Sequence, residues 1–337
     1  MLSLQHIKFI QDNLKENVSK LILKGIPFND VEVSFIAEQI SARQRMNKKL
    51  ATWVANQNIV FPKKMNLEQS SSEKTAEYKS KIIQDEDLVC DLTGGFGVDA
   101  FALAQTNKKV IHIEQNTELS DLVKYNVHDV LNQQNITCYA VSAEDFLENL
   151  NTKVDWFYID PSRRDQNKKK VFLFKDSEPN FIDLLPKLKQ KSKYSLIKTS
   201  PLIDISYGIK ALKYVRKIHV VCIENELKEL LWELDFSLEN SNPLISTVQF
   251  KPKYTNTFDF QFNSENNSLT YAEPIQYIYE PNAALMKVGK FDDLAEAFQL
   301  KKLHPNSHLF TSTELQKAFP GRVFFIKEIR EYKPKIL

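Results

Sequence analysis

Glycine is scarce in this chain, and the few glycines are gathered in one place. Only 7 of the 337 residues are glycine, yet Gly94, Gly95 and Gly97 lie within four positions. Glycine loses more backbone entropy on folding than any other residue, so a chain that otherwise avoids it is expected to use it here for a purpose. The usual purpose is a tight turn between a strand and a helix, where a ligand approaches the backbone closely.

Cysteines and long apolar runs are also scarce, and each absence excludes a class of protein. The 3 cysteines, Cys90, Cys138 and Cys222, lie far apart in apolar surroundings, which favours buried free thiols over a disulfide framework. No apolar run approaches the roughly 20 residues of a membrane-spanning helix. The N-terminus lacks a signal-peptide cleavage region, and the potential metal ligands are scattered. We therefore expect a cytoplasmic protein with no membrane association and no metal site.

Strand and helix patterns alternate through the middle of the chain. Between residues 87 and 234, short apolar runs typical of strands covered on both faces are separated by helical patterns. This alternation predicts a doubly wound, Rossmann-like α/β sheet. The predicted strands are Leu88–Asp91, Lys109–Glu114, Ile136–Val141, Trp156–Asp160, Tyr194–Lys198 and Ile218–Ile223.

The chain is too long for a single compact core, and its patterns change twice. Residues 1–80 have helical patterns, residues 81–235 form the predicted α/β core, and residues 236–337 combine strand and helix patterns. We therefore predict an N-terminal helical domain, a central α/β domain and a small C-terminal α+β domain with these boundaries.

Several features outside the predicted core have plain structural interpretations. The basic residues from Arg43 to Lys49 are expected on the solvated face of a helix, and Phe324 and Phe325 are expected in a core. Ser70 and Glu73 have the spacing of a capping box at a helix start. Bases dominate between residues 163 and 217, but charge alone leaves a polyanionic partner and ordinary solvated helices equally open.

Acidic residues follow four successive predicted strands. Asp91 ends the first strand, Glu114 ends the second, the pair Glu144–Asp145 follows the third, and Asp160 ends the fourth. Because ligands bind at the carboxyl ends of the strands in open α/β sheets, these acids are expected at one ligand-binding edge. One such acid is weak evidence, whereas four with a glycine turn after the first form a strong pattern.

The acids and the turn suit an adenosine-containing ligand with a positive charge. A carboxylate at Glu114 can accept both ribose hydroxyls, Asp145 can accept from the adenine amine, and Asp91 suits a methionine-type ammonium. The alternative is a dinucleotide site, since Gly95, Gly97 and Ala100 match G-x-G-x-x-A. A carboxylate beside the turn would repel a pyrophosphate, so the pattern favours S-adenosylmethionine over NAD.

The segment from Asp160 to Arg164, Asp-Pro-Ser-Arg-Arg, predicts the place of substrate chemistry. Proline after a strand-end acid ends the strand, so that the Asp160 carboxylate and the Pro161 carbonyl can face the amine of a planar base. Methyl transfer depends mainly on alignment of the nucleophile, which Asp160 would hold or deprotonate. Arg163 and Arg164 can bind phosphate. The simpler interpretation is a turn with a local Arg–Asp pair.

These motifs resemble those of class I S-adenosylmethionine-dependent methyltransferases, specifically the bacterial group with a C-terminal THUMP-like domain. Segments at 68–79, 279–284 and 319–322 extend the resemblance over most of the chain. Thr93, in place of the first glycine of D-x-G-x-G-x-G, and Ser162, in place of a second proline, depart from the common pattern. The resemblance implies a Rossmann-like methyltransferase core with an N-terminal helical domain, and a C-terminal domain in which a ferredoxin-like segment precedes a THUMP-like domain.

The resemblance also implies site residues, a cofactor and a partner. The implied cofactor is S-adenosylmethionine, and the implied activity is methylation of a base nitrogen in structured RNA, either tRNA or rRNA. Two alternatives stay open: a non-catalytic RNA-binding or assembly protein with a vestigial cofactor site, and a methyltransferase of proteins or small molecules. The expected catalytic residues are Asp160, Pro161, Ser162 and Arg163. The expected cofactor-binding residues are Asp91, Thr93, Gly94, Gly95, Phe96, Gly97, Glu114, Gln115, Glu144, Asp145 and Asp160.

Overall fold

The computed structural model describes residues 2–163, 174, 177–264 and 269–330, and its chain divides into two compact units. Of the described residues, the first unit comprises 2–163, 174 and 177–195, and the second comprises 196–264 and 269–330. These two units do not coincide with the three predicted domains, because the first includes both the N-terminal helices and the first four strands of the α/β core.

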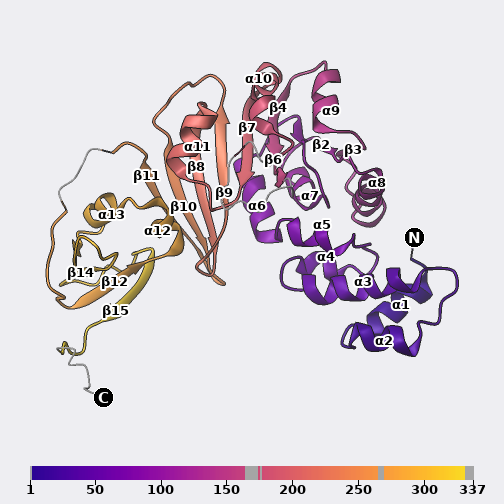
Figure 1. Cartoon of the computed structure of the whole chain (residues 1–337), viewed down its shortest axis with the longest axis horizontal. Coiled ribbons are helices and arrows are strands. Elements are labelled where there is room, and N and C mark those ends of the chain that lie inside the picture. Colours follow the sequence, from indigo (N-terminus) through magenta and orange to yellow (C-terminus); the bar gives the residue numbers. More distant parts are fainter. Residues whose placement is uncertain (1, 164–173, 175–176, 265–268, 331–337) are drawn as a thin grey trace. The chain divides into compact units, whose positions relative to one another are not determined.

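Six helices precede the first strand, coloured indigo to purple in Figure 1. The first three enclose a small core of their own, in which Ile10, Leu21 and Ile36 are buried. The next residues pack on the α/β part: the Asn126 amide donates to the carbonyl oxygen of Val60 and accepts from its N–H. The helices are α1 (Leu4–Asp12), α2 (Val18–Lys24), α3 (Val33–Met46), α4 (Ala51–Ala55), α5 (Lys64–Gln69) and α6 (Glu73–Ile82).

The structure corrects two expectations about these helices. Arg43 is buried rather than solvated, and its guanidinium donates to the carbonyl oxygens of Gln39, Gln57 and Ile59. The helix expected to start from a Ser70–Glu73 capping box has Ser72 as its N-cap, and the Glu73 carboxylate instead accepts from the N–H of Thr52 at the start of α4. The Arg43 and Glu73 side chains both form hydrogen bonds with residues more than ten positions away, and local sequence spacing does not reveal such contacts.

Arg43→Met is expected to lower the free energy of unfolding by about 3 kcal/mol, because buried carbonyl oxygens lose their donors. Arg45→Met on the same helix is the matched control, since Arg45 is exposed, and it is expected to stay within about 0.5 kcal/mol of wild type. Urea unfolding followed by circular dichroism measures both. Equal stabilities of the two variants would contradict the prediction.

In the first unit, strands and helices alternate as predicted. The strand order is β7-β4-β1-β2-β3, and β1 pairs in parallel with both β2 and β4. The chain moves outward from β1 through β2 to β3 and then returns to place β4 on the other side of β1. Strand order therefore reverses between β1 and β4, which is where open α/β sheets bind their ligands. The elements are β1 (Val89–Asp91), α7 (Val98–Ala104), β2 (Val110–Ile113), α8 (Thr117–Tyr125), β3 (Ile136–Tyr139), α9 (Ala143–Asn149), β4 (Val154–Ile159), α10 (Phe181–Lys191) and β7 (Ser192–Thr199).

Strand burial explains why the sequence patterns were informative. All three residues of β1 are buried, and β4 has four consecutive buried residues, Trp156–Ile159. Polar N-cap residues mark the starts of two helices between the strands. The side chains of Asn116 and Ser142 accept from backbone N–H groups in the first turns of α8 and α9. The fold is thus the predicted Rossmann-like α/β core.

In the second unit, strands of order β11-β10-β8-β9 form a mixed sheet, which is followed by a small sheet of order β13-β14-β12-β15. Strands β10 and β11 pair within the same sheet as β8, so this sheet continues across the predicted boundary at residue 235. The elements are α11 (Ile205–Leu212), β8 (Val215–Ile223), β9 (Glu226–Asp235), β10 (Leu244–Phe250), β11 (Thr255–Gln261), β12 (Tyr277–Pro281), α12 (Ala283–Val288), α13 (Phe291–Ala297), β13 (Lys301–Lys302), β14 (Phe310–Ser312) and β15 (Gly321–Phe325).

The structure also tests the expected burial of two phenylalanines and of the three cysteines. Phe324 and Phe325 are 48% and 58% exposed, so their expected place in a core was wrong; β15 ends one side of its small sheet and leaves them uncovered. The cysteines are free, with Cys90 and Cys222 buried and Cys138 half-buried. Among the described residues, no helix combines the length and the apolar character that crossing a bilayer requires.

Candidate functional site

The glycine turn joins the end of β1 to the start of α7. The N–H of Gly94 donates to the carbonyl oxygen of Ile113 on β2 (2.7 Å), and the N–H of Gly97 donates back to the carbonyl oxygen of Gly94 (2.9 Å). Gly97 has φ +80°, in the left-handed region, and a Cβ there would meet Val123 at 2.7 Å. The turn is therefore hydrogen-bonded to β2 and packs closely against Val123 of α8.

His112 lies directly beneath the turn. A Cβ built on Gly94 would lie 2.2 Å from the His112 Nε2 atom, so glycine is required there for space. Burial lowers the pKa of His112 to about 4, so the imidazole is neutral at pH 7. Its Nε2 atom lies 3.3 Å from the carbonyl oxygen of Gly95, to which it must donate because a carbonyl only accepts. The His112 imidazole therefore fills the space beneath Gly94 and prevents the turn from moving toward β2.

Asp91 is 1% exposed at the base of the turn, and one of its oxygens is unused. Oδ1 accepts from the N–H of Thr93 (3.0 Å), whereas Oδ2 has no hydrogen-bond partner among the described residues. Burial raises the pKa of Asp91 well above its ordinary range; the nearby Asp99 and Asp160 carboxylates add to this, and Lys79 opposes it. A buried carboxylate oxygen without a hydrogen-bond partner is costly, so this oxygen suits a hydrogen-bond donor or a positive charge supplied by a ligand.

Thr93 connects the ends of the two strands at the reversal point. Its hydroxyl oxygen accepts from the backbone N–H of Asp160 (2.6 Å), just after β4. The N–H of Leu92 also donates to the carbonyl oxygen of Tyr158 (3.0 Å). The residue that replaces the usual first glycine is therefore a bridge that holds Asp160 beside the turn.

Glu114 accepts from the turn itself. Its Oε2 atom accepts from the N–H of Gly95 (3.2 Å), and its Oε1 atom accepts from the N–H of Asn116 (2.8 Å). Partial burial raises its pKa, and the two N–H donors act in the opposite direction. Each oxygen keeps a further lone pair, so this carboxylate can still accept a pair of hydroxyls.

The remaining predicted cofactor residues lie around this group in different ways. The Phe96 side chain is buried and packs on Trp53 (ring centroids 4.9 Å apart), so it leaves only its backbone for a ligand. Gln115 is exposed just after β2, and Glu144 is exposed in the first turn of α9. Asp145 is exposed in the first turn of α9, where it accepts from the hydroxyl of Ser142.

The predicted catalytic residues follow β4. Asp160 and Pro161 are half-buried, and Ser162 is exposed and pairs through β5 (Ser162–Arg163) with β6 (Ser177–Glu178). Only the backbone of Arg163 is described, and Arg164 lies outside the described residues. Direct contacts thus join Asp91 to Thr93, Thr93 to Asp160, and Gly95 to Glu114. Thr93 and Gly95 belong to the same turn, as expected of strand ends at one edge.

Sequence reasoning missed a buried polar cluster beside Asp91, formed by Ser71, Lys79, Asp99 and Tyr158. The Lys79 ammonium lies 2.9 Å from Asp99 Oδ1, and both the Ser71 and Tyr158 hydroxyls donate to Asp99 Oδ2. A signal was available, since Lys79 follows Thr75 and Ala76 at helical spacing on the buried face of α6. We call this group the Lys79 cluster.

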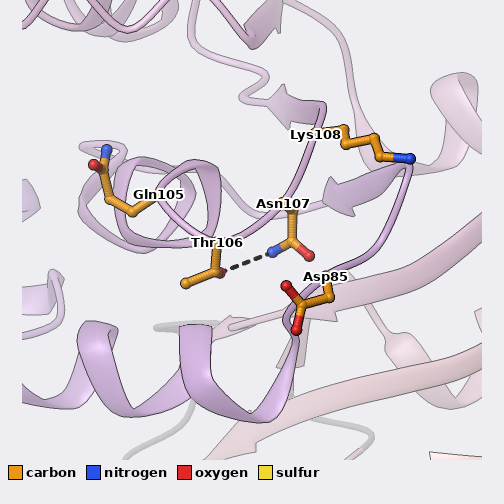
Figure 2. A pocket seen from close by; sticks show the side chains of 5 residues that line it. All are labelled: Asp85, Gln105, Thr106, Asn107 and Lys108. Atoms are coloured by element: carbon orange, nitrogen blue, oxygen red, sulfur yellow. Dashed lines mark hydrogen bonds between the residues drawn. The ribbon is translucent and has the colours of Figure 1, made fainter.

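A surface hollow elsewhere in the first unit has no part in this site. It is lined by Asp85, Gln105, Thr106, Asn107 and Lys108, which precede β1 and β2 and so lie at the amino ends of these strands (Figure 2). The Asn107 amide donates to Thr106 Oγ1 and to the carbonyl oxygen of Ile83, which are structural contacts. Within the described ranges, no group of three or more His, Cys, Asp and Glu side chains could hold a metal ion.

Comparisons with known proteins include a solved structure that is similar along nearly the whole chain. The crystal structure of a candidate methyltransferase from Porphyromonas gingivalis W83 is 32% identical, with a TM-score of 0.86, and the match covers 96% of this chain and 82% of that chain. A family model described as a ferredoxin-like domain matches residues 277–320. No curated protein matches the chain.

Two other solved structures resemble about half of the chain. An rRNA methylase from Streptococcus thermophilus is 16% identical with a TM-score of 0.35, covering 48% of this chain and 94% of that chain. TrmK of M. capricolum, in complex with S-adenosylhomocysteine, is 13% identical with a TM-score of 0.38, covering 49% of this chain and 69% of that chain.

Proposed function

The chain belongs to the same family as the candidate methyltransferase of Porphyromonas gingivalis W83, and from that premise we propose that it is an S-adenosylmethionine-dependent methyltransferase acting on RNA. One observation carries the cofactor proposal. The buried Asp91 carboxylate keeps an unused oxygen at the base of a turn whose Gly94 has no room for a Cβ. A pyrophosphate would be repelled there, whereas a ligand with ammonium and sulfonium charges is attracted.

The residues present fit this cofactor. Asp91 would accept from its ammonium, Glu114 from its ribose hydroxyls and Asp145 from its adenine amine, while the N–H groups and carbonyls of residues 93–97 offer backbone contacts. When bound, the cofactor supplies an electrophilic methyl group. Asp160, held beside the turn by Thr93, would orient the target nitrogen and accept its proton.

The proposed substrate is a base nitrogen of structured RNA, either tRNA or rRNA. Asp160 and Pro161 are consecutive, half-buried residues after β4, and a carboxylate and a carbonyl there would suit the amine of a planar base. Basic residues dominate the segment from 163 to 217, which favours a polyanion. Phe324 and Phe325, being exposed, are available for stacking with unpaired bases.

Calorimetric titration of the purified protein with S-adenosylmethionine tests the cofactor proposal. We expect saturable one-site binding with a dissociation constant in the micromolar range, roughly 8 kcal/mol of binding free energy. Glu114→Gln is expected to weaken binding about tenfold, because a ribose hydroxyl loses a charged acceptor. Absence of binding at millimolar cofactor would overturn the proposal and favour a vestigial site.

Mass spectrometry of RNA nucleosides from a strain lacking the gene tests the substrate proposal. We expect one methylated nucleoside to disappear from tRNA or rRNA and to return when the wild-type gene is restored. Binding of the RNA is expected to weaken steeply with salt, because phosphate contacts release counterions. An unchanged nucleoside profile would contradict the RNA substrate and favour a protein or small-molecule substrate.

A further inference from the structure

The Lys79 cluster connects the helices before β1 to the base of the glycine turn. Lys79 is fully buried on α6, and its ammonium donates to the Ser71 hydroxyl (2.7 Å) as well as pairing with Asp99. Asp99 is in the first turn of α7, two residues after Gly97. Tyr158 on β4 completes the cluster, with its ring 5.5 Å from the Lys79 ammonium.

The cluster lies against Asp91. Tyr158 is the register partner of Asp91 on the neighbouring strand, and His112 is its partner on the other side. The charged groups that act on the Asp91 carboxylate come from three elements: Asp99 on α7, Asp160 after β4, and Lys79 on α6. His112 is neutral, so it contributes no charge to this balance.

The buried groups around Asp91 include more carboxylates than ammonium groups. Asp91 and Asp99 are both buried carboxylates, and Lys79 is a buried ammonium whose ion pair is made with Asp99. The Asp91 oxygen Oδ2 keeps no partner among the described side chains and backbone groups. Two buried carboxylates and one ammonium leave one negative charge for a ligand to match, or for a proton to neutralise.

We propose that Lys79 is a positioning residue that acts through Asp99: by neutralising Asp99, it leaves Asp91 as the carboxylate that receives the positively charged part of the cofactor. This inference rests on the proposed function. Lys79 belongs to the segment that precedes the strand–turn–helix motif, so a residue outside that motif sets the electrostatics of the site.

A pH dependence of binding follows from this arrangement. Only ionised Asp91 attracts a positive ligand, so in the empty protein a proton on Asp91 competes with the cofactor. Affinity therefore rises with pH and levels off once Asp91 is ionised in the empty protein. The raised pKa of Asp91 places this change at a higher pH than for an ordinary aspartate.

Lys79→Met and Asp99→Asn are expected to move this pH profile in opposite directions. Lys79→Met removes a positive charge near Asp91, so the pKa of Asp91 rises. The pH at which cofactor affinity reaches its plateau is then expected to rise by about one unit. Asp99→Asn leaves the Lys79 ammonium without its counter-charge, so the plateau moves down by a similar amount. The double variant removes both charges, and its profile is expected to return close to that of wild type.

Calorimetric titration with S-adenosylmethionine from about pH 5.5 to about pH 9 measures these profiles. Titration of the ligand itself is common to all variants, so the comparison is between variants. Lys81→Met is the matched control: Lys81 is exposed on the same helix and pairs with Glu77, and its profile is expected to equal that of wild type. Asp91→Asn is expected to remove the protein's contribution to the profile.

The outcomes separate the inference from the proposed function. Absence of wild-type binding overturns both, whereas wild-type binding with the same profile in Lys79→Met and Asp99→Asn overturns only the inference. A double variant that loses the summed affinity of the two single variants and does not return to the wild-type pH profile also overturns it, because that is the result of a packing role. If a single variant fails to fold, the double variant and Asp91→Asn decide, and a wild-type profile in Asp91→Asn then overturns the inference.

Discussion

Gly94→Ala is expected to weaken binding of S-adenosylmethionine by about a hundredfold or more. The new Cβ would lie 2.2 Å from the His112 Nε2 atom and 2.3 Å from Cδ2, so either the turn or the imidazole must move. The imidazole is fully buried, and the turn is tied to β2 by the Gly94 N–H. We therefore expect the turn to be displaced from the ligand, as calorimetry with the folded variant will measure.

Two further variants identify the cause of this loss. Gly94→Ala combined with His112→Ala makes room for the Cβ and is expected to regain at least tenfold of the lost affinity. Gly289→Ala is the control for a glycine-to-alanine change without a clash, since nothing lies within 4 Å of a built Cβ at Gly289, although its φ of +73° makes alanine strained there. It is expected to bind the cofactor like wild type. Equal affinity of Gly94→Ala and wild type would contradict the assigned role of the turn.

Asp160→Ala is expected to lower the rate of methyl transfer by about a thousandfold while cofactor affinity stays within about threefold of wild type. The contact that places residue 160, from its backbone N–H to Thr93 Oγ1, does not involve the side chain and persists in the variant. What is lost is the carboxylate proposed to orient the target nitrogen. Transfer of radiolabelled methyl groups to total RNA from a strain lacking the gene measures the rate.

Asp121→Ala is the control for this experiment, because Asp121 is exposed on α8, and its rate is expected to equal that of wild type. Thr93→Val tests the same contact from the other side. Without the hydroxyl acceptor, the N–H of Asp160 loses its partner, and we expect an intermediate loss of rate. Full activity of Asp160→Ala would remove Asp160 from the proposed chemistry.

The strands of the first unit could be predicted because their evidence is local. Val89–Asp91 and Trp156–Ile159 are continuous buried runs, and a strand covered on both faces must have such a composition. The outcome was different for Arg43, Phe324 and Phe325. Their residue types predict exposure for the arginine and burial for the phenylalanines, whereas the structure buries the first among backbone carbonyls and exposes the others at the end of a sheet.

The positions of the candidate site residues at the strand ends could be predicted for the same local reason. Asp91, Glu114 and Asp160 each end a strand or follow it directly, and parallel strands bring their carboxyl ends to one edge. Sequence spacing does not contain the contacts that control these residues. Thr93 holding Asp160, and His112 filling the space beneath Gly94, depend on neighbours that come from other strands.

By itself, the sequence determined a strand, glycine turn and helix followed by strand-end acids, because adjacent residues encode these features. Only the tertiary structure decided which of the carboxylates is neutralised and which keeps an oxygen for a ligand. Lys79 and Asp99 are twenty positions apart, on different helices, and their pairing beside Asp91 exists only once α6 packs on α7. The energy of a buried charge depends on the groups within a few ångströms of it, and folding alone brings those groups together.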